Sequence, residues 1–89
     1  MTKFNGIIVK EKKISFFFKY DKSDPTQIHI YVRHLTSIDD ALDAFFDGIK
    51  VWNEENKRYE STNDSHCLYW FWLDEKKKKV MIISCFKLN

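Results

Sequence analysis

HCLYWFWLDEKKKKVMIISCFKL, residues 66–88, carries the strongest structural signal in the chain. Two apolar runs rich in β-branched and aromatic residues flank an uninterrupted charged run, which is the pattern of a β-hairpin. Alternate side chains of a strand point to opposite faces, so Leu68 and Trp70 share one face and Tyr69 and Phe71 share the other. A strand that is apolar on both faces is typical of the centre of a sheet. We therefore expect this hairpin to be central.

Two registers of the hairpin are compatible with the sequence. If the loop has an odd number of residues centred on Lys76, Cys67 lies opposite Cys85, and the sulfur atoms come within disulfide reach in an oxidising environment. If the loop has an even number of residues, Cys67 lies opposite Phe86 instead. Both thiols belong to apolar runs, so in a cytosolic protein we expect them to be buried and reduced in either register.

Three β-prone segments precede the hairpin and predict an antiparallel meander. Residues 4–9 and 14–20 flank a tight turn at Glu11-Lys12, and turn-forming residues at 21–26 separate the second segment from residues 27–33. The third segment alternates most regularly. It would place Ile28, Ile30 and Val32 on one face and His29, Tyr31 and Arg33 on the other.

One amphipathic helix is predicted between residues 38 and 47. Ser37 is a favourable N-cap, and Asp40 occupies the third helical position expected in a capping box. Gly48 follows where a left-handed C-cap is expected. The face expected to pack on the sheet is the apolar stripe Ile38, Leu42, Phe45 and Ile49.

The segment between the helix and the hairpin is mostly polar. Residues 49–52 are suited to begin a further strand, and residues 53–65 are expected to be mostly loop, with brief pairing at Arg58-Tyr59. The predicted fold class is α+β: an antiparallel sheet of five or six strands with one helix packed on a face, in the order βββα(β)ββ. At 89 residues, the chain (1–89) is expected to form a single domain.

Composition narrows the class of protein. The chain has 17% aromatic residues, two glycines and one proline, which excludes a linker or a low-complexity segment. Its apolar runs are too short for the core of a signal peptide or for a membrane span, so no membrane association is expected. Two cysteines without an export signal favour a reducing compartment, and we expect a cytoplasmic protein.

Charge is distributed unevenly along the chain. The formal net charge is only +2, yet residues 35–64 carry eight acidic and three basic side chains between two basic ends. Asp39, Asp43 and Asp47 repeat at i, i+4 and i+8 of the predicted helix, where like charges repel, and Asp47 lies at the negative end of the helix dipole. Such a dipolar surface favours steered association with a charged partner.

The preferred hypothesis is a small non-enzymatic protein-binding module of the inhibitor or immunity type. Its acidic helix and the following loop would act as a nucleic-acid mimic and block a basic surface of a nuclease or another nucleic-acid-handling protein. Exposed aromatic side chains would anchor the interface. The candidate protein-binding residues are Asp39, Asp40, Asp43, Asp47, Glu54 and Glu55.

Two alternatives remain open at this point. His29, Tyr31, Arg33 and His34 would form the surface of a small RNA-binding protein or ribonuclease toxin, or the exposed face of the aromatic hairpin would join two copies in a homodimer. No catalytic motif, metal site or cofactor is predicted. The histidines and cysteines lack ligand spacing, and the two glycines form no phosphate loop.

Overall fold

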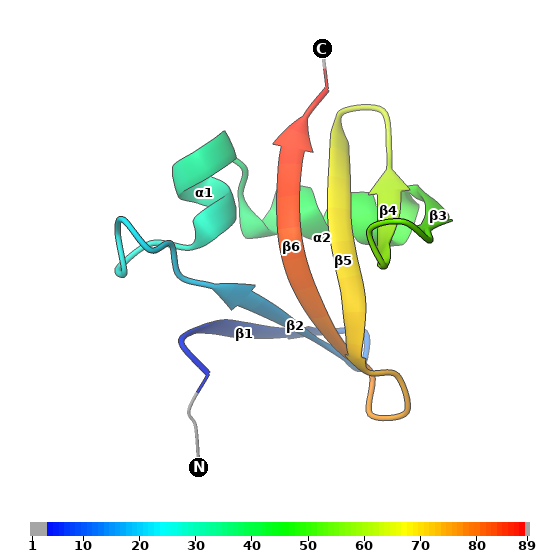
Figure 1. Ribbon diagram of the computed structural model, residues 1–89, viewed down its shortest axis with the longest axis horizontal. Coiled ribbons are helices and arrows are strands. Elements are labelled where there is room, and N and C mark those ends of the chain that lie inside the picture. Colours follow the sequence, from blue (N-terminus) through cyan, green and yellow to red (C-terminus); the bar gives the residue numbers. More distant parts are fainter. Residues whose placement is uncertain (1–3, 89) are drawn as a thin grey trace.

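The computed structural model describes residues 4–88, which form six strands and two helices (Figure 1). In chain order the elements are β1 (Gly6–Glu11), β2 (Ile14–Lys19), α1 (His29–His34), α2 (Ile38–Asp47), β3 (Ile49–Asn53), β4 (Arg58–Thr62), β5 (His66–Asp74) and β6 (Lys79–Lys87).

All six strands belong to one mixed sheet, in the order β1-β2-β6-β5-β4-β3. The β2–β6 pair is parallel, and every other pair is antiparallel. The α+β class is therefore confirmed, whereas the prediction of a wholly antiparallel sheet is wrong. The β5–β6 hairpin lies at the centre, as its two apolar faces predicted (Figure 1).

The predicted strand over residues 27–33 is wrong, because most of this segment forms α1. Only a single bridge, between Tyr20 and Ile28, continues the expected pairing. His29 and Arg33 stand four residues apart, a spacing that brings both to one helix face, where both contact Asp21. A run of six or seven residues is too short to separate the two-residue period of a strand from the 3.6-residue period of a helix. Tertiary contacts therefore decide between strand and helix here. The element order is consequently ββααββββ rather than βββα(β)ββ.

The helix α1 takes the place of a strand beside the second half of β6. The parallel β2–β6 pairing ends at Ile82, and α1 then packs on β6 (Figure 1). The buried hydroxyl of Thr36, which follows α1, lies 2.8 Å from the carbonyl oxygen of Cys85 and 3.0 Å from that of Ile30. This hydroxyl provides a donor at the side of β6 that β2 no longer covers.

The polar segment before the hairpin contains more strand than the sequence predicted. Residues 49–53 form β3, as expected, but residues 58–62 form a full strand that pairs with both β3 and β5. Two contacts compensate for the weak β-propensity of β4. Tyr59 stacks on Trp70, with ring centroids 4.6 Å apart, and Arg58 forms an ion pair with Glu60 at 3.0 Å.

The central hairpin contains both of the registers that the sequence allowed. Cys67 lies opposite Phe86 and Leu68 opposite Cys85, but a bulge after Tyr69 shifts the pairing so that Trp70 lies opposite Ile82. Residues paired across strands share a face, so Cys67 and Cys85 point to opposite faces of the sheet. Both cysteines are free and buried, which confirms the expectation of buried thiols.

Helix α2 begins as predicted and ends differently. The Ser37 hydroxyl accepts a hydrogen bond from the Asp40 amide at 3.1 Å, and the Asp40 carboxylate accepts one from the Ser37 amide at 2.9 Å, so the capping box is confirmed. Gly48 is extended rather than left-handed, with φ −82°. A β-carbon at Gly48 would lie 2.3 Å from the carbonyl oxygen of Ala44 and 3.0 Å from the Thr62 backbone. Close backbone approach, not a positive φ, requires glycine here.

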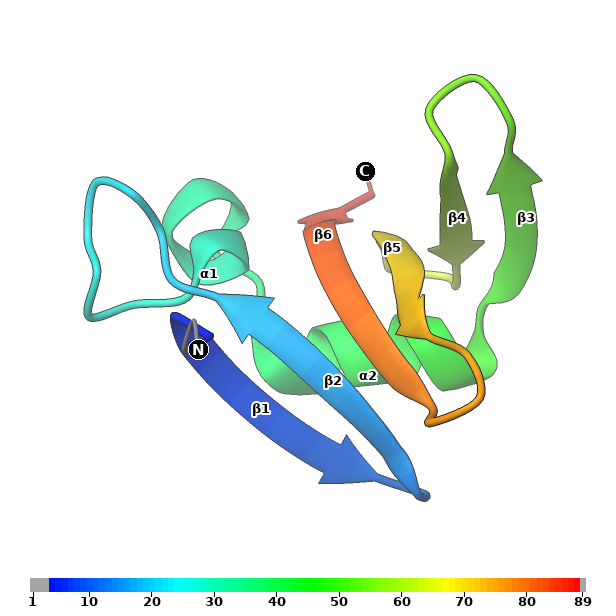
Figure 2. The same cartoon turned by 60° about the horizontal axis from the view of Figure 1, so that its bottom comes forward.

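One face of the sheet packs against α2, which crosses it in both views (Figures 1 and 2). Ala41 and Ala44 are fully buried there, and the ring of Phe45 lies 4.8 Å from that of Trp70. Leu68 and Trp70 therefore point toward α2, so the helix covers their face of the sheet and not the face of Tyr69 and Phe71. Ile49 was expected on this apolar stripe but begins β3 and is 76% exposed.

The β1–β2 turn offers a stability test. Lys12 and Lys13 form its two central residues with φ of 50° and 67°, a left-handed conformation that lysine adopts at a cost. Lys12→Asn with Lys13→Gly should raise the free energy of unfolding by about 1 kcal/mol, measured by urea denaturation. Gln at both positions removes the same charges but keeps the strain. Equal stability of the two variants would contradict the turn assignment.

Candidate functional site

The acidic face of α2 consists of Asp39, Asp43 and Asp47, and all three side chains are exposed. Within residues 4–88, none of these three carboxylates forms an ion pair. Their spacing along one helix face is therefore the one that the sequence predicted, and no ion pair with another described residue compensates their charge.

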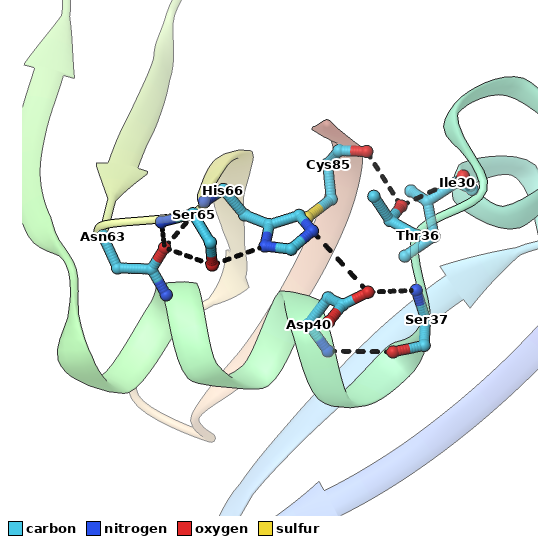
Figure 3. Close-up of polar contacts among 8 residues, drawn as sticks. All are labelled: Ile30, Thr36, Ser37, Asp40, Asn63, Ser65, His66 and Cys85. Carbon is cyan, nitrogen blue, oxygen red and sulfur yellow. Dashed lines mark hydrogen bonds and ion pairs between the residues drawn. The ribbon is translucent and has the colours of Figure 1, made fainter. Parts of the chain in front are cut away.

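Asp40, which the sequence also made a candidate protein-binding residue, lies outside this acidic face. Its carboxylate accepts the Ser37 amide in the capping box and lies 3.7 Å from Nε2 of His66 (Figure 3). The hydrogen bond from the Ser37 backbone, followed by the Ser37 hydroxyl and the charges of His66 and Lys87, lowers the pKa of Asp40. Asp40 thus joins the start of α2 to the start of β5, and less of its charge is available to a partner.

One row of contacts joins a serine, a histidine and an aspartate in the order of a hydrolytic triad: Ser65, His66 and Asp40 (Figure 3). Ser65 Oγ lies 2.8 Å from His66 Nδ1, but His66 Nε2 lies 3.7 Å from Asp40 Oδ2, which is too long for the hydrogen bond that orients a general base. Ser65 Oγ also lies 3.3 Å from Oδ1 of Asn63, whose side chain accepts the Ser65 and His66 amides. These contacts shape the turn before β5.

The turn between β3 and β4 carries the two remaining predicted residues. Glu54 accepts hydrogen bonds from Lys57 Nζ at 2.9 Å and from Trp52 Nε1 at 2.7 Å, and these bonds lower its pKa. Glu55 is exposed and has no ion pair with any residue that the structure describes. Trp52 itself is 44% exposed, so an exposed aromatic side chain lies beside the acidic turn.

An open hollow of about 670 Å³ is bordered by the end of α2, by β3, and by the end of β4 with the turn that follows it. Its apolar residues are Ile49 and Val51, which are 76% and 58% exposed. Its acidic residues are Asp47 and Asp64. The sequence did not reveal this site because Ile49 was assigned to the apolar stripe of α2. In the structure β3 begins at Ile49, and Ile49 and Val51 share a face as alternate residues of one strand.

Of the residues in the RNA-binding alternative, His29, Tyr31 and Arg33 were predicted to share one face, and this prediction is wrong. His29 Nδ1 and Arg33 Nε lie 2.9 and 3.1 Å from the same oxygen of Asp21, whose side chain is fully buried. Tyr31 instead borders a separate hollow, and the ring of His34 lies 6.0 Å from that of Phe86. The helix therefore directs His29 and Arg33 to a buried carboxylate, away from Tyr31.

Asp21 gives a pH test of this cluster. Hydrogen bonds from the Ser23 hydroxyl and amide, then from His29 and Arg33, hold the pKa of Asp21 well below its ordinary value of 3.8. A lowered folded-state pKa stabilises the fold above pH 3.8, and this contribution is lost as the pH falls from there toward the lowered pKa.

We expect Asp21→Asn to lower the melting temperature at pH 7, and the difference from the wild type to shrink steadily below pH 4. Thermal unfolding followed by circular dichroism from pH 7 to pH 2 measures both effects. Asp24→Asn is the matched control, because within residues 4–88 the Asp24 carboxylate accepts hydrogen bonds from Thr26 of the same turn and from no other residue. A constant difference across this pH range would contradict the proposed role of the Asp21 charge.

Both cysteines, Cys67 and Cys85, are free thiols buried in the sheet. Burial raises the pKa of the Cys85 thiol to about 12, so Cys85 remains protonated at neutral pH. Across the described part of the chain, no three side chains of His, Cys, Asp or Glu are grouped so that they could hold a metal ion.

The face of the sheet opposite α2 carries Tyr69 and Phe71, which are half-buried. The Arg58 guanidinium lies 3.7 Å from the centre of the Tyr69 ring, and the ring of Phe86 lies 5.2 Å from it. Intramolecular contacts therefore occupy part of the surface on which the homodimer hypothesis depends. That hypothesis stays a prediction.

Comparisons with protein-family models, curated proteins and solved structures found no match to this chain. Neither helix in residues 4–88 has the length and apolar character required to cross a membrane.

Proposed function

We propose that this chain is a small non-enzymatic protein-binding module, of the inhibitor or immunity type, that blocks a basic surface of a nucleic-acid-handling protein. The observation that carries the proposal is the line of exposed carboxylates at Asp39, Asp43 and Asp47, which lack ion pairs among the described residues. This line continues into the exposed apolar side chains of Ile49 and Val51.

The two parts of this surface have different roles in binding. Carboxylates four residues apart on a helix rise by about 6 Å per step, so they present a row of negative charge to a basic groove. Charges of this kind accelerate encounter and exclude acidic competitors more than they increase affinity. Exposed apolar and aromatic side chains, here Ile49, Val51 and Trp52, supply the buried anchors that slow dissociation.

Asp47 supports a binding role over a stabilising one. It lies in the last turn of α2, where the helix dipole disfavours a negative charge, and no basic residue shares that turn. Asp43 and Asp47 also repel each other at i, i+4. These carboxylates therefore contribute little to the fold, whereas a basic partner surface would interact favourably with both.

Affinity capture tests the proposal directly. The tagged chain is used to retain partners from a native lysate with and without nuclease treatment, and both proteins and nucleic acids are analysed. We expect one basic protein in stoichiometric amount, unaffected by nuclease and released by raised salt. Recovery of nucleic acid, or of proteins that disappear after nuclease treatment, would overturn the proposal in favour of the RNA-binding alternative.

A further inference from the structure

Strand β3 is an open edge of the sheet. It pairs with β4 on one side and is the last strand in the sheet order (Figure 2). Protein sheets usually protect such edges with a proline, a bulge or outward-pointing charges. β3 has no proline, and its register with β4 is continuous from Ile49 to Asn53. Its one charged residue, Lys50, lies over the ring of Tyr59 at 5.1 Å.

Carboxylates lie at both ends of this open edge. Asp47 and Asp64 border the hollow beside Ile49, at the start of the strand. Glu54 and Glu55 follow directly after its last residue; Glu54 pairs with Lys57, and Glu55 has no ion pair among the described residues. An apolar strand edge between two acidic ends is complementary to an extended segment that is apolar in the middle and basic at its ends.

We propose that β3 binds an extended, basic segment of the partner protein as an additional strand of the sheet. The inference rests on the proposed function, because it names the binding mode of the same acidic surface. Main-chain hydrogen bonds to β3 provide affinity, and Ile49 and Val51 contact apolar side chains of the added strand. Lys or Arg at its ends contacts the carboxylates of Asp47 and Asp64 or of Glu54 and Glu55.

A second copy of this chain is a poorer occupant of the same edge. In a parallel β3–β3 pair, the acidic ends of the two strands coincide. In an antiparallel pair, Asp47 and Asp64 of one copy lie beside Glu54 and Glu55 of the other. Both arrangements place carboxylates against carboxylates, which is unfavourable. The charge pattern therefore selects a basic partner.

The test uses random twelve-residue peptides displayed on phage and selected on the full chain. We expect enriched peptides with β-branched residues at every second position of a central segment and with Lys or Arg at both ends of that segment. A synthetic copy, titrated into the isotope-labelled protein, should shift the backbone amide signals of residues 47–53. Methylating alternate backbone nitrogens of the peptide removes donors needed for strand pairing, and we expect at least tenfold weaker binding.

Val51→Lys is the corresponding change in the protein, and we expect it to weaken peptide binding at least tenfold. The matched control is Ile8→Lys on the other edge strand, since Ile8 is 54% exposed and Val51 is 58% exposed. Affinity should stay within twofold for this control. The inference is overturned if no peptide is enriched, or if binding survives both Val51→Lys and backbone methylation.

Failure of this inference is distinguishable from failure of the proposed function. If the protein captured from the lysate still binds Val51→Lys as tightly as the wild type but depends on Asp39, Asp43 and Asp47, the acidic interface stands and strand addition is wrong. If its binding depends on neither set of residues, both proposals are wrong.

Discussion

Trp70→Ala is expected to destabilise the protein by about 3–5 kcal/mol, a large part of the 5–15 kcal/mol that holds a typical domain together. Trp70 is only 1% exposed and lies in the β5 strand at the centre of the sheet. Its ring stacks on Tyr59, with centroids 4.6 Å apart, and lies 4.8 Å from the ring of Phe45 on α2. Removing the indole therefore leaves a cavity between the helix and two strands.

Urea denaturation followed by circular dichroism measures this loss, and Trp70→Phe separates its causes. Phenylalanine retains most of the packing but leaves the buried Ser61 hydroxyl without its donor, since Trp70 Nε1 lies 2.9 Å from Ser61 Oγ. We expect that variant to lose about 1–3 kcal/mol. Trp52→Ala is the control because Trp52 is 44% exposed. A loss for Trp52→Ala as large as that for Trp70→Ala would contradict the assignment of the core.

The central role of Trp70 could be predicted from the sequence, and so could the elements that depend on local patterns. The β5–β6 hairpin, the β1–β2 hairpin and the capping box of α2 each rest on residues close together in the chain. The hairpin register could not be predicted, because the bulge after Tyr69 combines both candidate registers in one strand pair. Bulges arise from packing against other strands, which no short stretch of sequence encodes.

The prediction of a strand over residues 27–33 failed for a different physical reason. Their alternation is compatible with a strand, but the spacing of His29 and Arg33 also suits a helix face, and a buried carboxylate eight residues upstream of His29 binds both side chains. The signal that could have indicated the helix is this pair of basic residues, His29 and Arg33, four positions apart after Asp21. Sequence alone does not show that Asp21 is buried, so the pair had no apparent partner.

The candidate site likewise combines features that local sequence determines with features that tertiary contacts determine. Asp39, Asp43 and Asp47 could be placed on one exposed face, because helical period and capping define that face. Asp40 lies near His66 instead, and this could not be predicted, because it depends on a tertiary contact between the start of β5 and the start of α2. The hollow at Ile49 and Val51 likewise depends on the pairing of β3 with β4.

Changing Asp39, Asp43 and Asp47 together to Asn should slow association with the captured partner by about 10- to 100-fold at low ionic strength. The dependence of the association rate on salt should also become much flatter, because steering by exposed charges is screened within a Debye length. Dissociation should change less, since the apolar anchors at Ile49 and Val51 remain. Stopped-flow mixing over a range of salt concentrations measures both rates.

Two features make this triple change interpretable. Asn at Asp43 and Asp47 removes like-charge repulsion within α2, whereas Asn at Asp39 removes a charge that the helix dipole favours in the first turn. These small effects oppose each other, so the fold should be about as stable as before, which thermal unfolding of the triple variant checks. A second variant with Asn at Asp24 and Asp74 and Gln at Glu75 produces the same change in net charge at sites outside the acidic face. If this control slows association equally, net charge rather than the face of α2 steers the partner. If the triple variant associates as fast as the wild type, α2 is not the interface.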